Sequence, residues 1–211
     1  QGARQTAYRI RVGIPTGNQI TILWDTQTVQ DDRSIGIEYG GPALKSATRY
    51  VWEVSVRDET GVWLEPAKGV FTTGLLVADD WKGSEWIAVP GQAIISPDKP
   101  PKNEHAAPGT SCFVKTLDLG ANIREAYWTV TGQGVFEVFV NGSRVGEDFR
   151  NPGFTHVFKT RHAFTYDVTD LLAKTGENVF AAMVSAGWWR DKIVHYRGKE
   201  SAFRAQLIVR Y

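Results

Sequence analysis

Apolar residues recur at every second position in short runs along most of this 211-residue chain. The clearest run of the first half is residues 50–57, in which Tyr50, Trp52, Val54 and Val56 are the alternate members. A period of two places alternate side chains on one face of a β-strand, whereas a helix needs a period near 3.6. Helical periodicity is almost absent, and the 21 glycines supply turn formers between the runs. The pattern therefore predicts an all-β protein.

The first third of the chain carries the signals of a small β-sandwich. Alternating runs at residues 8–12 and 20–24 are separated by an expected turn at residues 13–18. After the strand at residues 50–57, the sequence Asp58-Glu59-Thr60-Gly61 has the chemistry of a hairpin turn, and residues 70–72 carry the returning strand. We therefore predict that residues 1–77 form one domain.

This first domain resembles a fibronectin type III module. Leu44 and Tyr50, placed around Thr48 just ahead of Trp52, resemble the tyrosine corner and core tryptophan of such modules. Fibronectin type III modules normally begin with another strand, but only residues 1–5 precede the first alternating run here. We therefore expect a sandwich whose first strand is missing.

A proline-rich stretch follows. Residues 90–109 hold five of the nine prolines, and proline both removes a backbone donor and fixes φ. Such a stretch predicts a surface loop, within a second domain at residues 78–211, rather than a proline-rich ligand for another domain.

The remainder of the chain again predicts short strands. The hairpin around Asn141-Gly142 is the firmest local prediction, because both residues accept the positive φ angles of a two-residue turn. The turn also accounts for the glycosylation sequon at Asn141. Residues 167–172 have a capping residue and one apolar turn, which predicts a single helical turn before Gly176. This spacing favours a jelly roll, with strands expected at residues 113–119, 126–130, 135–140, 179–185 and 203–209.

Several segments of this second half resemble the N-terminal domain of bacterial α-L-rhamnosidases. The Asn-Gly hairpin and an Asp-Val-Thr turn are shared with many galactose-binding-like jelly rolls, so they indicate only the fold. The Pro-Gly-aromatic-Thr and Gly-Trp-aromatic-Arg segments narrow the resemblance to the rhamnosidase family. The family often has tyrosine and glycine where this chain has Trp189 and Asp191. The segments that carry the resemblance are residues 140–146, 151–155, 166–172, 176–178 and 187–190.

The resemblance implies an accessory role rather than catalysis by this chain. The family hydrolyses terminal α-linked L-rhamnose with inversion, using two carboxylates in an (α/α)6 barrel, and we expect that barrel to be absent from this chain. Inversion needs an acid and a base that flank the sugar. No local motif marks such a pair among Glu125, Glu137, Glu147, Asp148 and Asp191, so we predict no catalytic residue here.

The implied partners are a rhamnose-containing glycan and the catalytic barrel of the parent protein. Extracellular or periplasmic placement is implied in the same way. Lysine and arginine total 24 against 23 acidic residues, which gives a net charge of +1. This charge is too small to attract nucleic acid, so we expect no nucleic-acid partner. No apolar stretch approaches the length of a membrane span, so we expect no membrane partner.

The candidate binding site is Trp188-Trp189-Arg190-Asp191. A tryptophan face stacks on the C–H face of a sugar, while arginine and aspartate bind hydroxyl groups. Strand alternation would send one of the two tryptophans into the core, and the other could instead contact the catalytic barrel. Sugar binding, interdomain contact and core packing all stay open.

A weaker candidate is a calcium site at Asp148 and Asn151, with the backbone around Pro152. Calcium takes six to eight oxygen ligands, and these residues do not supply that number, so turn chemistry is the competing interpretation. The four histidines and Cys112 lack metal-type spacing, and we expect no other cofactor. Three functions remain: accessory scaffold, carbohydrate-binding module and free enzyme, in that order.

Overall fold

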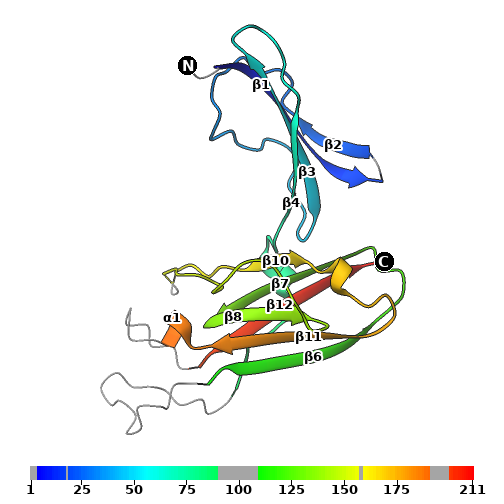
Figure 1. The fold of residues 1–211 in the computed structure, drawn as a ribbon, viewed down its shortest axis with the longest axis vertical. Helices are drawn as coiled ribbons and strands as arrows, with labels where there is room; N and C mark the ends of the chain where they lie inside the picture. The colour runs from blue at the N-terminus through cyan, green and yellow to red at the C-terminus, as the bar shows by residue number, and fades with distance from the viewer. Residues whose placement is uncertain (1–3, 18, 90–108, 157–158, 191–199) are drawn as a thin grey trace. The chain divides into compact units, whose positions relative to one another are not determined.

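The computed structural model describes residues 4–17, 19–89, 109–156, 159–190 and 200–211 (Figure 1). The chain divides into two compact units, Gln1–Leu76 and Val77–Tyr211. The first unit has one antiparallel sheet and the second has two. The predicted proline-rich loop falls almost wholly on residues 90–108, which lie outside the described residues.

The first unit contains one four-stranded sheet in the order β2-β1-β3-β4. Its β1 is longer than predicted, because a bulge between Val12 and Gly13 lets the strand continue to Thr16 instead of turning at residue 13. A Cβ at Gly13 would lie 2.4 Å from the carbonyl oxygen of Thr21, so glycine permits this close pairing. The strands are β1 (Gln5–Thr16), β2 (Gln19–Asp25), β3 (Arg49–Asp58) and β4 (Ala67–Thr72).

One face of this sheet is apolar. Val12 pairs with Trp24 on β2 and with Trp52 on β3, so the three side chains form a row. The ring of Tyr39, from the segment at residues 26–48, packs edge-on against Trp24 with centroids 5.0 Å apart. That segment contains no named strand, and an isolated bridge joins its Val29 to Tyr8 of β1.

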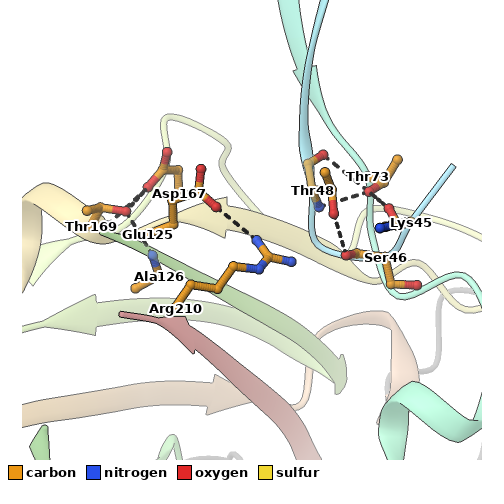
Figure 2. A network of polar contacts seen from close by, with 9 residues as sticks. All are labelled: Lys45, Ser46, Thr48, Thr73, Glu125, Ala126, Asp167, Thr169 and Arg210. Atoms are coloured by element: carbon orange, nitrogen blue, oxygen red, sulfur yellow. Dashed lines mark hydrogen bonds and ion pairs between the residues drawn. The ribbon is translucent and has the colours of Figure 1, made fainter. Parts of the chain in front are cut away.

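The predicted tyrosine corner is confirmed. Tyr50 is buried, and its hydroxyl oxygen accepts a hydrogen bond of 2.8 Å from the backbone N–H of Lys45. The ring stacks on Phe71 with centroids 5.3 Å apart. The Thr73 hydroxyl donates to the carbonyl oxygen of Lys45 and accepts from the N–H of Thr48, so the residue that follows β4 also holds this bend (Figure 2).

The opposite face carries a row of alternating charges across all four strands. Asp25, Arg11, Glu53 and Lys68 lie directly opposite one another in the strand register. Arg11 and Lys68 both pair with Glu53, whose side chain is only 8% exposed, while Arg9 pairs with Asp25. Alternation predicts an outward position for Glu53 but not its burial, which comes from these long neighbouring side chains.

The second unit is a jelly roll of two four-stranded sheets (Figure 1). The sheet orders are β10-β7-β12-β5 and β6-β11-β8-β9. All five predicted strands are present, β9 is the returning strand of the predicted hairpin, and β5 and β10 are additional. The strands are β5 (Ile87–Ala88), β6 (Ser111–Leu119), β7 (Glu125–Gln133), β8 (Val135–Val140), β9 (Ser143–Arg144), β10 (Phe164–Asp167), β11 (Gly176–Ser185) and β12 (Ala202–Arg210).

An aromatic core lies between these two sheets. Trp128 packs edge-on against Phe180 with centroids 5.1 Å apart, and Phe136 packs against Phe203 at 5.8 Å. All four side chains are buried. Aromatic rings contribute large apolar areas, so this cluster is the main stabilising element of the unit.

The Asn-Gly hairpin is confirmed, with φ of 50° at Asn141 and 81° at Gly142. The Asn141 amide donates to the carbonyl oxygen of Leu171 and to Asn178, and its oxygen accepts from the N–H of Val179. Asn178 is fully buried. The sequon asparagine therefore has a structural function that uses both ends of its amide.

In the ranges that the structure describes, helical structure is limited to three short turns, η1 (Ala78–Trp81), η2 (Thr169–Leu171) and α1 (Gly187–Arg190). The predicted turn after Asp167 is confirmed as η2, a 3-10 turn whose first residue bonds to the Asp167 carboxylate (Figure 2). The Thr169 hydroxyl also accepts from the N–H of Ala126, which ties η2 to β7. Across the described part of the chain, no helix combines the length and apolarity that crossing a membrane requires.

Candidate functional site

Trp188 and Trp189 lie on α1, not on a strand. The expectation that strand alternation would bury one and expose the other is therefore wrong, and both side chains are half-buried. Gly187 has φ of 46°, and a Cβ there would lie 2.3 Å from the Val135 side chain. Its left-handed backbone ends the extended β11 chain and begins the helical turn.

Trp189 is fixed by a hydrogen bond and a cation. Its indole Nε1 donates to the carbonyl oxygen of Glu200 at 2.9 Å. The guanidinium carbon of Arg161 lies 6.0 Å from the Trp189 ring centroid and 5.5 Å from that of Trp86. One cation thus contacts two indoles from distant parts of the sequence, which favours a rigid arrangement.

Trp188 makes a different contact. Its ring meets Phe154 edge-on, with centroids 6.4 Å apart. Phe154 is 58% exposed and follows the cis Asn151–Pro152 peptide bond and Gly153. Together, Trp86, Phe154, Trp188, Trp189 and Arg161 form what we call the aromatic patch.

A small hollow lies within the aromatic patch, bounded by both α1 tryptophans, Arg161, Pro152 and Gly134. Its volume is about 30 Å³, far below the roughly 300 Å³ at the lower limit of ordinary ligand pockets. A sugar ring does not fit inside it. Any sugar bound here would therefore stack on the surface of an indole.

The other two residues of the predicted cluster are less well placed. Arg190 ends α1, and its side chain lies outside the description, as does the whole of Asp191. Their predicted role in binding hydroxyl groups stays a prediction. Arg161, which the sequence did not single out, is the cation that the structure places beside the indoles.

Asp148 and Asn151 meet at the hydroxyl of Tyr166. The Asn151 amide donates to this hydroxyl at 3.0 Å, and the hydroxyl donates to Asp148 Oδ2 at 3.3 Å. The backbone oxygen of Asn151 accepts from Phe136, and that of Asp148 accepts from Arg144. Burial and then the Asp148 charge raise the pKa of Tyr166 to about 12, because both disfavour the phenolate.

The predicted calcium site stays a prediction. In the ranges that the structure describes, no three His, Cys, Asp or Glu side chains gather as a metal site would require. The acidic groups considered for catalysis include Glu125, which pairs with Arg210 at 3.0 Å, and Glu137, whose carboxylate lies 3.7 Å from Arg144. Both contacts are typical of ion pairs on a sheet surface.

Sequence reasoning missed Trp86 and Arg161 as members of the aromatic patch. The two residues lie 75 positions apart (161 minus 86) in the sequence. They belong to irregular segments without periodicity, and only the folded jelly roll brings them to α1. Phe154 was only weakly indicated as a site residue, because it belongs to the Pro-Gly-aromatic-Thr segment of the family resemblance.

The geometry defines a class of protein: a domain built on one four-stranded antiparallel sheet, followed by a jelly roll with a surface aromatic patch. Two family profiles match in the same order. Residues 1–77 match the Rha78A-like, N-terminal immunoglobulin domain, and residues 121–211 match the alpha-L-rhamnosidase N-terminal domain. The first domain thus corresponds to the immunoglobulin-like class of sandwich.

Whole relatives agree with these matches. An alpha-L-rhamnosidase of Formosa agariphila is 31% identical over 176 residues, which are 81% of this chain and 18% of that protein. One from an Alteromonas species is 29% identical over all of this chain and 23% of its own length. The solved alpha-L-rhamnosidase of Dictyoglumus thermophilum has a TM-score of 0.81 and 25% identity over 99% of this chain and 24% of its own.

The chain therefore belongs to the α-L-rhamnosidase-like proteins and carries their two N-terminal domains. It spans about a fifth of the length of the relatives it matches, 18% and 23% in the two sequences above. The expected resemblance and the predicted order of the domains are confirmed.

Proposed function

We propose that this chain is the accessory N-terminal region of an enzyme that hydrolyses terminal α-L-rhamnosides. The observation that carries the proposal is the succession of an immunoglobulin-like domain and a rhamnosidase N-terminal domain in one chain. Hydrolysis with inversion would be performed by two carboxylates of an (α/α)6 barrel in the rest of the full-length protein. The parent enzyme would act outside the cytoplasm, in the periplasm or medium.

The aromatic patch would serve as the contact with that barrel. Phe154 leaves more than half of its surface exposed, and it stands beside the half-buried Trp188. Adjacent, partly exposed aromatic side chains are typical anchors of protein interfaces. The hollow of about 30 Å³ is too small to enclose a sugar, which favours packing against a protein surface over a deep sugar pocket.

Carbohydrate binding is the second candidate. The observation that favours it is the partly exposed indole of Trp188 within the same surface as the Arg161 guanidinium. An indole face stacks on a sugar ring, and a guanidinium donates to hydroxyl groups. In this version the patch holds a rhamnosyl glycan near the barrel, and calcium at Asp148 and Asn151 would be its only cofactor.

The first experiment uses the full-length protein. Phe154→Ala and Trp188→Ala should lower kcat/KM for an aryl α-L-rhamnoside or the thermal stability of the barrel, because each removes part of a desolvated anchor. Trp63→Ala is the matched control, since Trp63 is a partly exposed tryptophan of the first domain. Unchanged activity and stability in both patch variants would refute the contact.

The second experiment separates the two roles of the patch. The 211-residue chain is titrated calorimetrically with L-rhamnose, with and without calcium. Saturable heat that Trp188→Ala abolishes and Trp63→Ala retains would establish the sugar site. No heat at millimolar sugar, together with loss of activity in the full-length variants, would leave the barrel contact as the function of the patch.

A further inference from the structure

A second cavity lies in the jelly roll, apart from the aromatic patch. It is a cleft of about 280 Å³ between the two sheets, beside their edge strands β5 and β6. None of the aromatic patch residues lines it. Its apolar walls are Phe113, Leu117, Trp128, Phe180, Phe203 and Leu207.

The cleft exists because the edges of the two sheets are unequal in length. β5 has two residues and pairs only with Ala202 and Phe203 of β12, whereas β12 continues to Arg210. On the other sheet, β6 continues for nine residues. Within the described residues, the edge of β12 beyond Phe203 therefore has no neighbouring strand on the β5 side. The core is open there toward β6, and Ala205 and Leu207 line the opening.

One wall of the cleft is held rigidly by an arginine. The lip, residues 81–86, precedes β5 and contributes Ser84 and Glu85 to the lining. The Arg204 guanidinium donates to the carbonyl oxygens of Trp81 and Ser84 and to the Ser84 hydroxyl at 2.9 to 3.0 Å. Its carbon also lies 4.9 Å from the Trp81 ring centroid. This fastening keeps the lip on the sheet, so the cleft is preformed.

The size and chemistry of the cleft define what it takes. An apolar cavity of about 150 Å³ is enough to bind benzene, and this one is nearly twice that volume. It lies close to the lower limit of ordinary ligand pockets, which is about 300 Å³, and is too small for a strand or helix with its side chains. The polar groups that line it are few, with Ser84, Glu85 and Lys115 as the polar side chains.

We propose that this cleft is a binding site for a small aromatic molecule of one or two rings, whose phenolic or glycosidic oxygen remains near Lys115 and Ser84. The ring would be either a free aromatic compound or the non-sugar part of a glycoside. The lip and β6 lie in residues 78–120, which neither family profile matches. The proposal rests on the cleft alone and does not depend on the role of the aromatic patch.

The test is calorimetric titration of the 211-residue chain with 2-naphthol, with 2-naphthyl α-L-rhamnoside and with L-rhamnose. The blocking variant is Ala205→Phe, which places a ring in the cleft. The matched control is Thr116→Phe, which adds the same ring to an exposed position of β6 outside the cleft. Circular dichroism checks the fold, and Leu117→Trp replaces the blocking variant if Ala205→Phe does not fold.

We expect saturable naphthol binding that Ala205→Phe weakens by at least about tenfold and Thr116→Phe leaves unchanged. Equal binding of the naphthyl rhamnoside would show that the ring is taken from either source, and binding of that rhamnoside alone would assign the cleft to glycosides. Absence of binding by both naphthyl compounds would overturn the proposal. Binding that survives Ala205→Phe would overturn it as well, because the ring would then lie elsewhere.

Discussion

Glu53 should contribute strongly to the stability of the immunoglobulin-like domain, and its contribution should depend on pH. Its side chain is 8% exposed and pairs with Arg11 on one neighbouring strand and with Lys68, at 3.3 Å, on the other. The Arg11 hydrogen bond, opposed by burial and assisted by Lys68, lowers the pKa of Glu53. Glu53→Gln keeps the shape of the side chain and removes the charge.

The magnitude follows from these contacts. A hydrogen bond to a charged group contributes about 1.5 to 3 kcal/mol, but Lys68 is 61% exposed and regains water when the pair is lost. We therefore expect Glu53→Gln to cost about 2 kcal/mol at pH 7, mostly through Arg11. In a domain of this size that is a fall of about 8 to 16 °C in Tm.

The pH dependence gives the sharper test. A carboxyl whose folded pKa lies below its unfolded value of about 4.3 stabilises the fold above that pH, and this stability is lost as pH falls through the folded pKa. The difference in Tm between Glu53→Gln and the unaltered chain should therefore be large at pH 7 and shrink below pH 4. Differential scanning calorimetry at several pH values measures it.

The control is Glu65→Gln, which neutralises an exposed glutamate of the same domain. It should change the stability by less than about 0.5 kcal/mol at every pH. A difference between Glu53→Gln and the unaltered chain that is the same at pH 7 and pH 3 would refute the electrostatic explanation. The effect would then have to come from packing.

Tyr50→Phe should cost about 1 to 2 kcal/mol in denaturant unfolding, because the N–H of Lys45 loses its acceptor; an unchanged midpoint would contradict the tyrosine corner. Asn178→Leu should cost about 3 kcal/mol, since the buried amide also accepts from the N–H of Ala173, and a variant as stable as the parent would disprove that role. Millimolar calcium should leave Tm unchanged, because the Asp148 loop already uses its oxygens internally; a rise in Tm would instead establish the predicted metal site.

The sequence alone determined the features that depend on local chemistry or on a period of two. The strands at residues 50–57 and 135–140 follow from alternation, and the Asn141-Gly142 turn follows from the φ angles those residues tolerate. The tyrosine corner was also readable, since Tyr50 and its partner Lys45 are five residues apart. In each case the residues that determine the structure are close in the chain, so the local sequence pattern is enough to predict it.

Only the tertiary structure decided which residues meet across the sheets. Burial of Glu53 needs Arg11 and Lys68 on the strands to either side. The sequence of a single strand does not specify which strands become its neighbours. Likewise, the sequence marked Trp189, but the folding of distant loops brought Arg161 to it. The apolar cleft arises from the short pairing of β5 with β12. These features depend on pairing between segments far apart in sequence, which a local period does not specify.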